Sequence, residues 1–266
     1  MTIREWIRDR EIHGKPMFSL DVLRKAFPQM SEQSILNALS RLKKERVLYS
    51  PYSSFYVTLP PQYVLRGAVP AYYYMDPLMT ALGHSYYFGL LSAAVLWGAA
   101  HQRPQRDIVV TTRPRLSLSS TSKRQIRWVY RNDIPTQFLR EKSGEAGKVV
   151  YSCAELTALD LVQFERHSGG LSVAATVMEE LLGVTDFRNA ANGLFQTCNM
   201  ATIQRLGYIV EVVLGETQQG ETIYREWRKC NPRPRYVALS PRAEVKGKRN
   251  GRWNIVINTE LETDET

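Results

Sequence analysis

The segment SEQSILNALSRLKKERV, residues 31–47, decides how the first part of this chain folds. Its apolar residues Ile35, Leu39 and Leu42 recur at the spacing that lines one face of an α-helix. Ser31 is a preferred N-cap residue, because its hydroxyl accepts a hydrogen bond from the first helical turn. The sequence therefore predicts an amphipathic helix that begins directly after Ser31.

Shorter elements surround this helix. Apolar residues at helical spacing predict a helix over residues 2–10, and Ser19 is a plausible cap for a second helix, which ends before the turn Pro28-Gln29-Met30. After the third helix, two β-like runs at residues 47–50 and 55–59 flank a turn. The order of two helices, a three-residue turn, a third helix and a hairpin is that of a winged helix-turn-helix.

Short polar side chains lie on the face of the third helix that points away from its apolar residues. A helix that reads the major groove needs amides or hydroxyls near its N-terminus to reach base edges, and cations further along to contact phosphates. Residues 1–60 hold 10 Lys or Arg against 6 Asp or Glu, so charge alone leaves open a protein-binding winged helix with a solvated polar face. The expected DNA-binding residues are Gln33, Ser34, Asn37, Ser40, Arg41, Lys44, and Tyr52 and Ser53 in the wing.

The pattern changes after Pro60-Pro61, which predicts a winged-helix domain over residues 1–66 and a larger mixed α/β domain over residues 67–266. The fold class expected for the whole chain is α+β. In the second domain, Asp76-Pro77 is expected to precede a long apolar helix that runs through Trp97. Helices are expected at residues 154–166, 171–182 and 186–206, and strands at 107–112, 126–130, 209–214, 236–239 and 253–258.

The composition indicates a globular protein with a polyanionic partner. The 266 residues carry 35 Lys or Arg against 26 Asp or Glu, a net charge of +9. Three cysteines are too few for a disulfide framework, which fits a reducing cytoplasm. Residues 1–11 are charged rather than apolar, and the uncharged run at residues 86–100 is shorter than the ~20 residues that span a bilayer. We therefore expect a cytoplasmic protein with no membrane partner, in which residues 86–100 form a buried helix.

Much of the positive charge lies outside the winged helix. Residues 101–148 hold 11 Lys or Arg against 4 acids, and residues 225–252 hold 10 against 2. Such runs are usually solvated faces, and the functional alternative is a second nucleic-acid surface. The best members of that second basic surface are Arg103, Arg106, Arg113 and Arg115.

Enzyme motifs are weak in this sequence. It has no glycine-rich phosphate loop, no His-Glu-x-x-His and no Gly-x-Ser-x-Gly. Glu244 and Lys246 form half of a nuclease metal site, but the acid usual on the preceding strand is missing. His101 is expected to make a hydrogen bond at a helix end rather than to bind a metal. We therefore predict no catalytic residue, no metal and no cofactor.

Several segments together resemble a known family. They are GKPMFSLDVLRKAF (14–27), SILNALSRLKKERVLYSPYSSFYVTLPPQY (34–63) and SYYFGLLSAAVLWGAAHQRPQRDIVVTTRPR (85–115), followed by SGGLSVAATVMEEL, QRLGYIVE and RWNIVIN. This series is similar to the AbiEi antitoxins of abortive-infection toxin–antitoxin systems. The segment HQRPQ, residues 101–105, is its most specific part.

The resemblance implies a bacterial type IV antitoxin that takes part in phage defence. In that family the winged helix represses its own operon at inverted repeats, and the C-terminal domain is associated with neutralising a nucleotidyltransferase-like toxin. The expected partners are therefore operator DNA and that toxin, with direct toxin contact left open. The alternative is a stand-alone regulator whose second domain senses a small molecule through Tyr72, Tyr73, Tyr74 and Trp97, although such aromatics are more often core. An enzyme such as a nuclease comes third.

Overall fold

The computed structural model describes residues 1–100, 104–113 and 125–262. The protein is a mixed α+β structure, as expected, and forms two compact units. The first comprises Met1–Tyr87, Gln105–Ile134 and Glu141–Val150; the second comprises Phe88–Pro104, Pro135–Arg140 and Tyr151–Thr266. The boundary expected after residue 66 lies inside the first unit, and the division into domains at that residue stays a prediction. In the part of the chain that the structure describes, no helix has the length and apolar character needed to cross a membrane.

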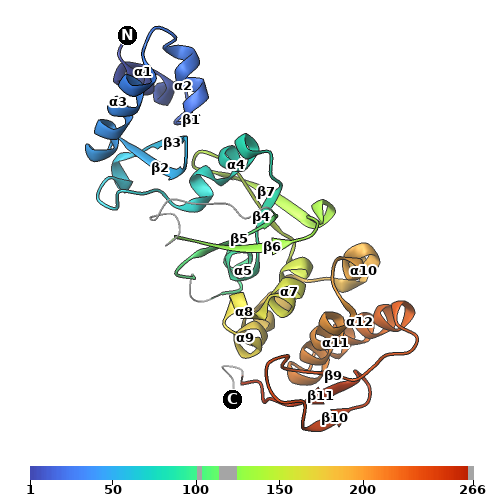
Figure 1. Cartoon of the computed structure of the whole chain (residues 1–266). Helices are drawn as coiled ribbons and strands as arrows, with labels where there is room; N and C mark the ends of the chain where they lie inside the picture. Colours follow the sequence, from blue (N-terminus) through green and yellow to red (C-terminus); the bar gives the residue numbers. More distant parts are fainter. Residues whose placement is uncertain (101–103, 114–124, 263–266) are drawn as a thin grey trace. The chain divides into compact units, whose positions relative to one another are not determined.

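The N-terminal part of the first unit packs three helices against a small sheet (Figure 1). The strands form an antiparallel sheet in the order β1-β3-β2. The hydroxyls of Ser19 and Ser31 cap the second and third helices, which confirms both predicted caps. The elements are α1 (Ile3–Ile12), β1 (Met17–Ser19), α2 (Leu20–Ala26), α3 (Glu32–Lys44), β2 (Leu48–Tyr52) and β3 (Phe55–Thr58).

After η1 (Pro61–Tyr63) and α4 (Ala71–Leu82) the chain forms a five-stranded sheet, most of whose residues belong to the first unit. This sheet has the order β6-β5-β4-β8-β7, and β5 and β6 pair in parallel over their full lengths. The predicted strands at residues 107–112 and 126–130 are confirmed. The strands are β4 (Tyr86–Phe88), β5 (Asp107–Thr112), β6 (Ile126–Arg131), β7 (Leu139–Gly144) and β8 (Gly147–Ser152).

The long helix expected from Pro77 through Trp97 is wrong, and so is the single buried helix over residues 86–100. Pro77 lies inside α4, Gly83 ends that helix in a left-handed conformation, and a strand precedes the short helix α5 (Leu90–Trp97). Proline usually opens a helix, since in the interior it removes a hydrogen bond at a cost of about 3 kcal/mol. Here the burial of Tyr74 and other residues before Pro77 outweighs that cost.

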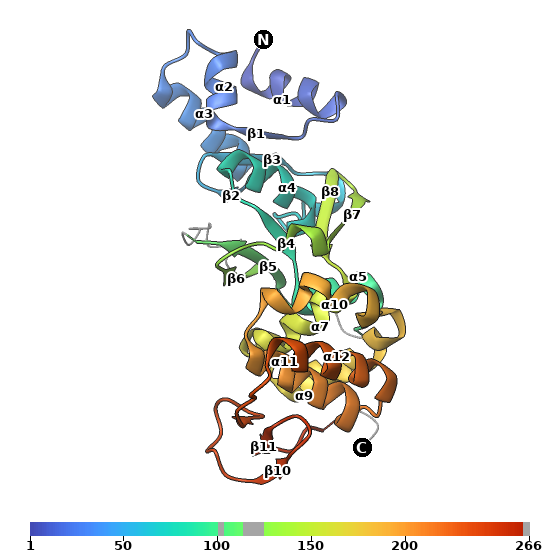
Figure 2. The same cartoon turned by 90° about the vertical axis from the view of Figure 1, so that its right-hand side faces the viewer.

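The second unit is mainly helical and ends in a small sheet. In both views α11 and α12 lie beside each other (Figure 1 and Figure 2). Strand β11 pairs antiparallel with β10 and parallel with β9. The elements include α7 (Ala154–Gln163), α8 (Glu165–Ser168), α9 (Leu171–Leu181), α10 (Phe187–Leu194), α11 (Met200–Tyr208), α12 (Thr217–Cys230), β9 (Val237–Ala238), β10 (Lys248–Asn250) and β11 (Ile255–Ile257).

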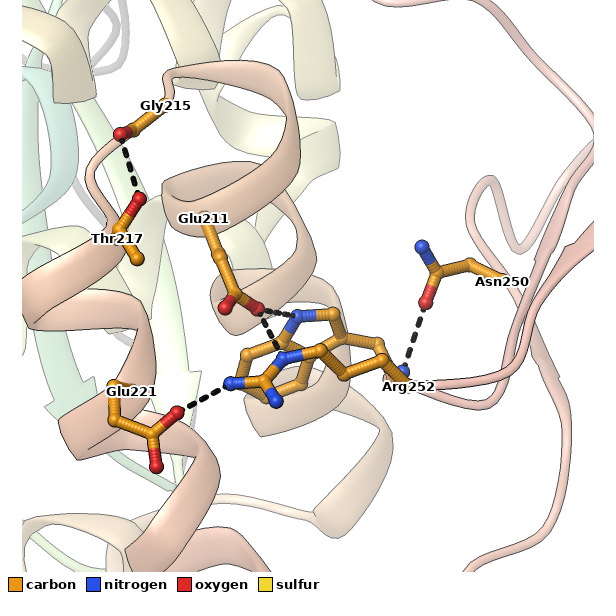
Figure 3. A network of polar contacts seen from close by, with 7 residues as sticks. Glu211, Gly215, Thr217, Glu221, Asn250 and Arg252 are labelled. Atoms are coloured by element: carbon orange, nitrogen blue, oxygen red, sulfur yellow. Dashed lines mark hydrogen bonds and ion pairs between the residues drawn. The ribbon is translucent and has the colours of Figure 1, made fainter.

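The strand expected at residues 209–214 is wrong, because Ile209–Val213 form a π-helix, η5, directly after α11. The β-branched run favours a strand locally, but burial of Ile209 and Val210 against the helical core decides otherwise. The π-helix also carries Glu211, whose carboxylate accepts hydrogen bonds from Trp253 Nε1 at 2.6 Å and from Arg252 Nε at 2.8 Å (Figure 3). These bonds join the C-terminal sheet to the helices of its own unit.

Candidate nucleic-acid interface

The helix α3 separates a buried face from a polar face. Ile35, Leu39 and Leu42 are at most 2% exposed and pack into the core with Trp6. All six residues predicted on the opposite side are exposed: Gln33, Ser34, Asn37, Ser40, Arg41 and Lys44. The apolar core thus holds the helix in place, while the side chains suited to DNA point to solvent.

Two of these side chains form a hydrogen-bonded pair. Gln33 Nε2 donates to Asn37 Oδ1 at 3.0 Å, across one turn of the helix. The bond leaves one amide's oxygen and the other amide's NH₂ group for a ligand, and exchanging oxygen and nitrogen in both amides leaves the same combination. Adenine is the base that presents an adjacent acceptor and donor, N7 and N6–H, in the major groove. The pair therefore has the hydrogen-bonding capacity to recognise adenine.

The N-terminus of α3 is ordered by local hydrogen bonds. The hydroxyl of Ser31 accepts from the backbone N–H of Ser34 at 3.2 Å and lies 2.8 Å from its hydroxyl. Glu32 is paired with Arg24 of α2, and this hydrogen bond raises the pKa of the arginine. Ser34 is thus engaged in the cap as well as exposed.

The cations of α3 lie towards its C-terminal end. Arg41 Nε is 3.9 Å from a carboxylate oxygen of Glu45, which also pairs with Arg4 of α1. Arg41 is 72% exposed at its side chain, and Lys44 is exposed as well. A long, solvated ion pair of this kind is weak, so both cations remain available to phosphates.

The two predicted wing residues lie at the end of the β2–β3 hairpin. Tyr52 is half-buried and is paired with Phe55 across the hairpin, whereas Ser53 is exposed. Ser54 completes the turn in the left-handed region, with φ of 60°. The hairpin therefore presents one small hydroxyl at its tip and keeps the tyrosine partly packed.

The second basic surface is only partly within the described residues. Arg106 and Arg113 are exposed at opposite ends of β5. At about 3.3 Å per residue they are roughly 23 Å apart along the strand, well beyond a screening length of ~8 Å. These two arginines therefore act separately, and nothing in β5 gathers them. Arg103 and Arg115, like His101, lie outside the described residues.

The aromatic residues that the sequence offered for a ligand pocket pack within the fold instead. Tyr73 and Tyr74 are 8% and 0% exposed within the first unit, beside the half-buried Tyr72. Trp97 belongs to the second unit, where its Nε1 donates to Ser152 O at 2.9 Å. Among the described residues, no group of three or more His, Cys, Asp or Glu is arranged to hold a metal ion.

Sequence reasoning missed α12 and the contacts of Glu211 with residues near the C-terminus. A charged residue within an apolar run was the available signal, but its partners are 41 and 42 positions away. The pKa of Arg252 is raised by its hydrogen bond to Glu211. No local sequence pattern predicts a contact between residues so far apart in the sequence.

Comparisons with known proteins relate part of this chain to a known family. Residues 87–212 match the model of the AbiEi antitoxin C-terminal domain. The chain is also similar in fold to the crystal structure of the RV2827C protein from Mycobacterium tuberculosis, with a TM-score of 0.65 and 12% sequence identity over 90% of this chain and 85% of that one. No curated protein matches the sequence. The resemblance to the AbiEi antitoxins that was predicted from the sequence is confirmed by the match of residues 87–212 to that family's C-terminal domain.

Proposed function

We propose that this protein is an AbiEi-type antitoxin and that it binds operator DNA through a winged helix-turn-helix formed by residues 1–60. The order α1, β1, α2, α3, β2, β3 and the strand order β1-β3-β2 support this assignment. The exposed face of α3 carries the proposal, since an amide pair near the helix N-terminus precedes two exposed cations. In this scheme α3 enters the major groove and the β2–β3 hairpin is the wing.

Gln33 and Asn37 read base edges, and Arg41 and Lys44 contact phosphates. Ser34, Ser40 and Ser53 add hydroxyls at the same surface, and Tyr52 supports the wing. The family implies that the operator is an inverted repeat in the protein's own promoter, so binding represses the antitoxin–toxin operon. Two copies of the chain then occupy half-sites related by the symmetry of the DNA.

The C-terminal domain neutralises a co-encoded nucleotidyltransferase-type toxin in the bacterial cytoplasm. The match of residues 87–212 to the AbiEi antitoxin C-terminal domain supports this role. The protein acts by binding rather than by catalysis. Co-expression tests it: the intact chain should restore growth to cells that express the neighbouring toxin, and growth arrest with folded antitoxin present would contradict the role.

The DNA role is tested on operator and random duplexes. Gln33→Ala and Asn37→Ala should each weaken operator binding by about 1–3 kcal/mol and leave random duplex almost unchanged, because they remove base contacts. Lys44→Ala should weaken both duplexes alike and reduce the salt dependence. The control is Gln62→Ala, which removes an exposed amide outside α3.

Base substitution in each half-site tests the adenine assignment. One A·T pair should lose its preference in the Gln33→Ala and Asn37→Ala proteins, while other positions keep theirs. Equal losses on operator and random duplex would show that the two amides do not read bases.

A further inference from the structure

Residues 225–252 form the most basic segment among the described residues that the proposed function does not use. They hold ten cations and two acids, and they follow the end of the AbiEi-matched segment at residue 212. Their charge is therefore unexplained both by α3 and by the matched domain.

Four of the ten cations are neutralised by acids. Arg252 pairs with Glu211 and Glu221, and Arg242 Nε lies 3.3 Å from Glu165 Oε1. The other two are Lys229, paired with Glu226, and Lys246, paired with Glu244. The remaining six make no ion pair with a described residue and are all exposed: Arg225, Arg228, Arg233, Arg235, Lys248 and Arg249. These six and Tyr236 are called the C-terminal basic face below.

The sheet brings the two ends of this segment together. Val237 of β9 and Asn250 of β10 both lie opposite Ile255 of β11, so residues just before β9 lie across the sheet from β10. The guanidinium carbon of Arg249 lies 5.0 Å from the centre of the Tyr236 ring. The start of β9, preceded by Arg235 and Tyr236, therefore lies at the same end of the sheet as the end of β10, next to Arg249.

The side chain of Tyr236 is exposed and available for stacking rather than packed in the hydrophobic core. Tyr236 is 43% exposed although it is a large aromatic residue. A Cβ at position 251 would lie 3.9 Å from the Tyr236 hydroxyl, an ordinary van der Waals contact, so this neighbour does not crowd the tyrosine. An exposed ring beside a planar guanidinium is the arrangement on which unpaired bases stack.

The bonds of Glu211 hold this surface in shape. Arg252 lies between Glu211 and Glu221, as Figure 3 shows, and its guanidinium covers the ring of Tyr224 at 4.0 Å. The chain that returns from β10 is thereby fixed to η5 and α12 before any ligand binds. A preorganised surface loses less conformational entropy on binding.

We propose that the C-terminal basic face binds single-stranded nucleic acid. Its unneutralised arginines contact the phosphates, and Tyr236 with Arg249 stacks a base. A duplex keeps its bases stacked on one another and offers no free base to the tyrosine, so the ring favours a single strand. The proposal does not depend on operator binding by α3.

The test uses the full-length protein and fluorescein-labelled 12-nucleotide oligo(U) and oligo(dT), with binding followed by anisotropy over a salt series. Tyr236→Leu should weaken binding about tenfold without changing the salt slope, because it removes only stacking. Replacing Arg225, Arg228, Arg233 and Arg235 by Gln should reduce the slope of log K against log salt by up to about 3, at ~0.7 for each phosphate that is no longer neutralised. Circular dichroism checks that each variant is folded.

The matched control is the double variant Glu226→Gln/Lys229→Gln, which removes a paired cation at unchanged net charge and should bind within about twofold of the original protein. Equal binding of both oligomers supports recognition of phosphate and base alone, and tighter binding of oligo(U) supports recognition that includes the ribose 2′-OH. Absence of binding to either oligomer at 100 mM salt would overturn the proposal. Identical salt slopes for the original protein and the fourfold arginine variant would also overturn it. Equal competition by a random duplex would overturn the preference for single strands and indicate general attraction of polyanions.

Discussion

One methyl group added at Gly207 of α11 should destabilise the protein strongly. A Cβ there would lie 2.0, 2.1 and 2.6 Å from three ring carbons of Trp253, against the ~3.5–4.0 Å of favourable carbon contacts. The ring is fully buried, and its centroid is 5.5 Å from that of Trp227 and 5.3 Å from that of Tyr224. It therefore has no open space into which to move.

The expected cost follows from the two ways in which the protein can respond. Overpacking with the ring retained costs about 1–3 kcal/mol, and loss of the tryptophan from its site costs about 3–5 kcal/mol. Displacement also breaks the bond from Trp253 Nε1 to Glu211, and a hydrogen bond to a charged group contributes about 1.5–3 kcal/mol. Gly207→Ala should lower the free energy of unfolding by about 3 kcal/mol or more, which corresponds to a fall in Tm of roughly 6–12 °C.

Urea and thermal unfolding, followed by tryptophan fluorescence and circular dichroism, measure this effect. Gly183→Ala is the matched control, because a Cβ there meets nothing within 4 Å and its φ is not in the left-handed region. That variant should stay within about 0.5–1 kcal/mol of the original protein. In the Gly207→Ala background, Trp253→Leu should cost less than it does alone. A Gly207→Ala protein as stable as the control would refute the reasoning.

Three further outcomes are expected. Leu39→Ala should lower the free energy of unfolding by about 2–5 kcal/mol in urea titrations, because Leu39 is 1% exposed, whereas Leu36→Ala, at a position 38% exposed, should cost less than about 1 kcal/mol. Burial raises the pKa of Cys153 to about 12, so iodoacetamide at pH 8 should modify exposed Cys230 and leave Cys153 intact by mass spectrometry. Because the folded state favours the neutral thiol, the stability that Cys153 contributes is full below pH 9, its ordinary pKa, and is lost as the pH rises towards about 12. If the region around β5 contacts DNA, Arg106→Gln/Arg113→Gln should reduce the salt slope of operator binding, and superimposable slopes would mean that both arginines are merely solvated.

Local sequence patterns were sufficient to predict the N-terminal elements. Ser19 and Ser31 cap helices as predicted, and the three-residue turn at Pro28 separates α2 from α3. Each of these features depends on residues within four positions of one another, so each can be predicted directly from the sequence. The outer face of α3 follows from the same periodicity, because burying Ile35, Leu39 and Leu42 leaves the amides exposed. The pairing of Gln33 with Asn37 is also local, since residues four apart are neighbours on a helix.

The tertiary structure determined the features that local patterns do not predict, and three sites show the same physical reason. Pro77 lies within a helix, and residues 209–213 are helical despite their β-branched side chains, because burial outweighs local preferences. The exposed ring of Tyr236 beside Arg249 depends on pairing β10 and β9 through β11. By itself the sequence determined the elements that depend on interactions between residues at most four positions apart, and the order of its segments indicated the family. Contacts between residues tens of positions apart are selected by packing in the complete fold, so only the tertiary structure brings Glu211 to Trp253 and Arg249 to Tyr236.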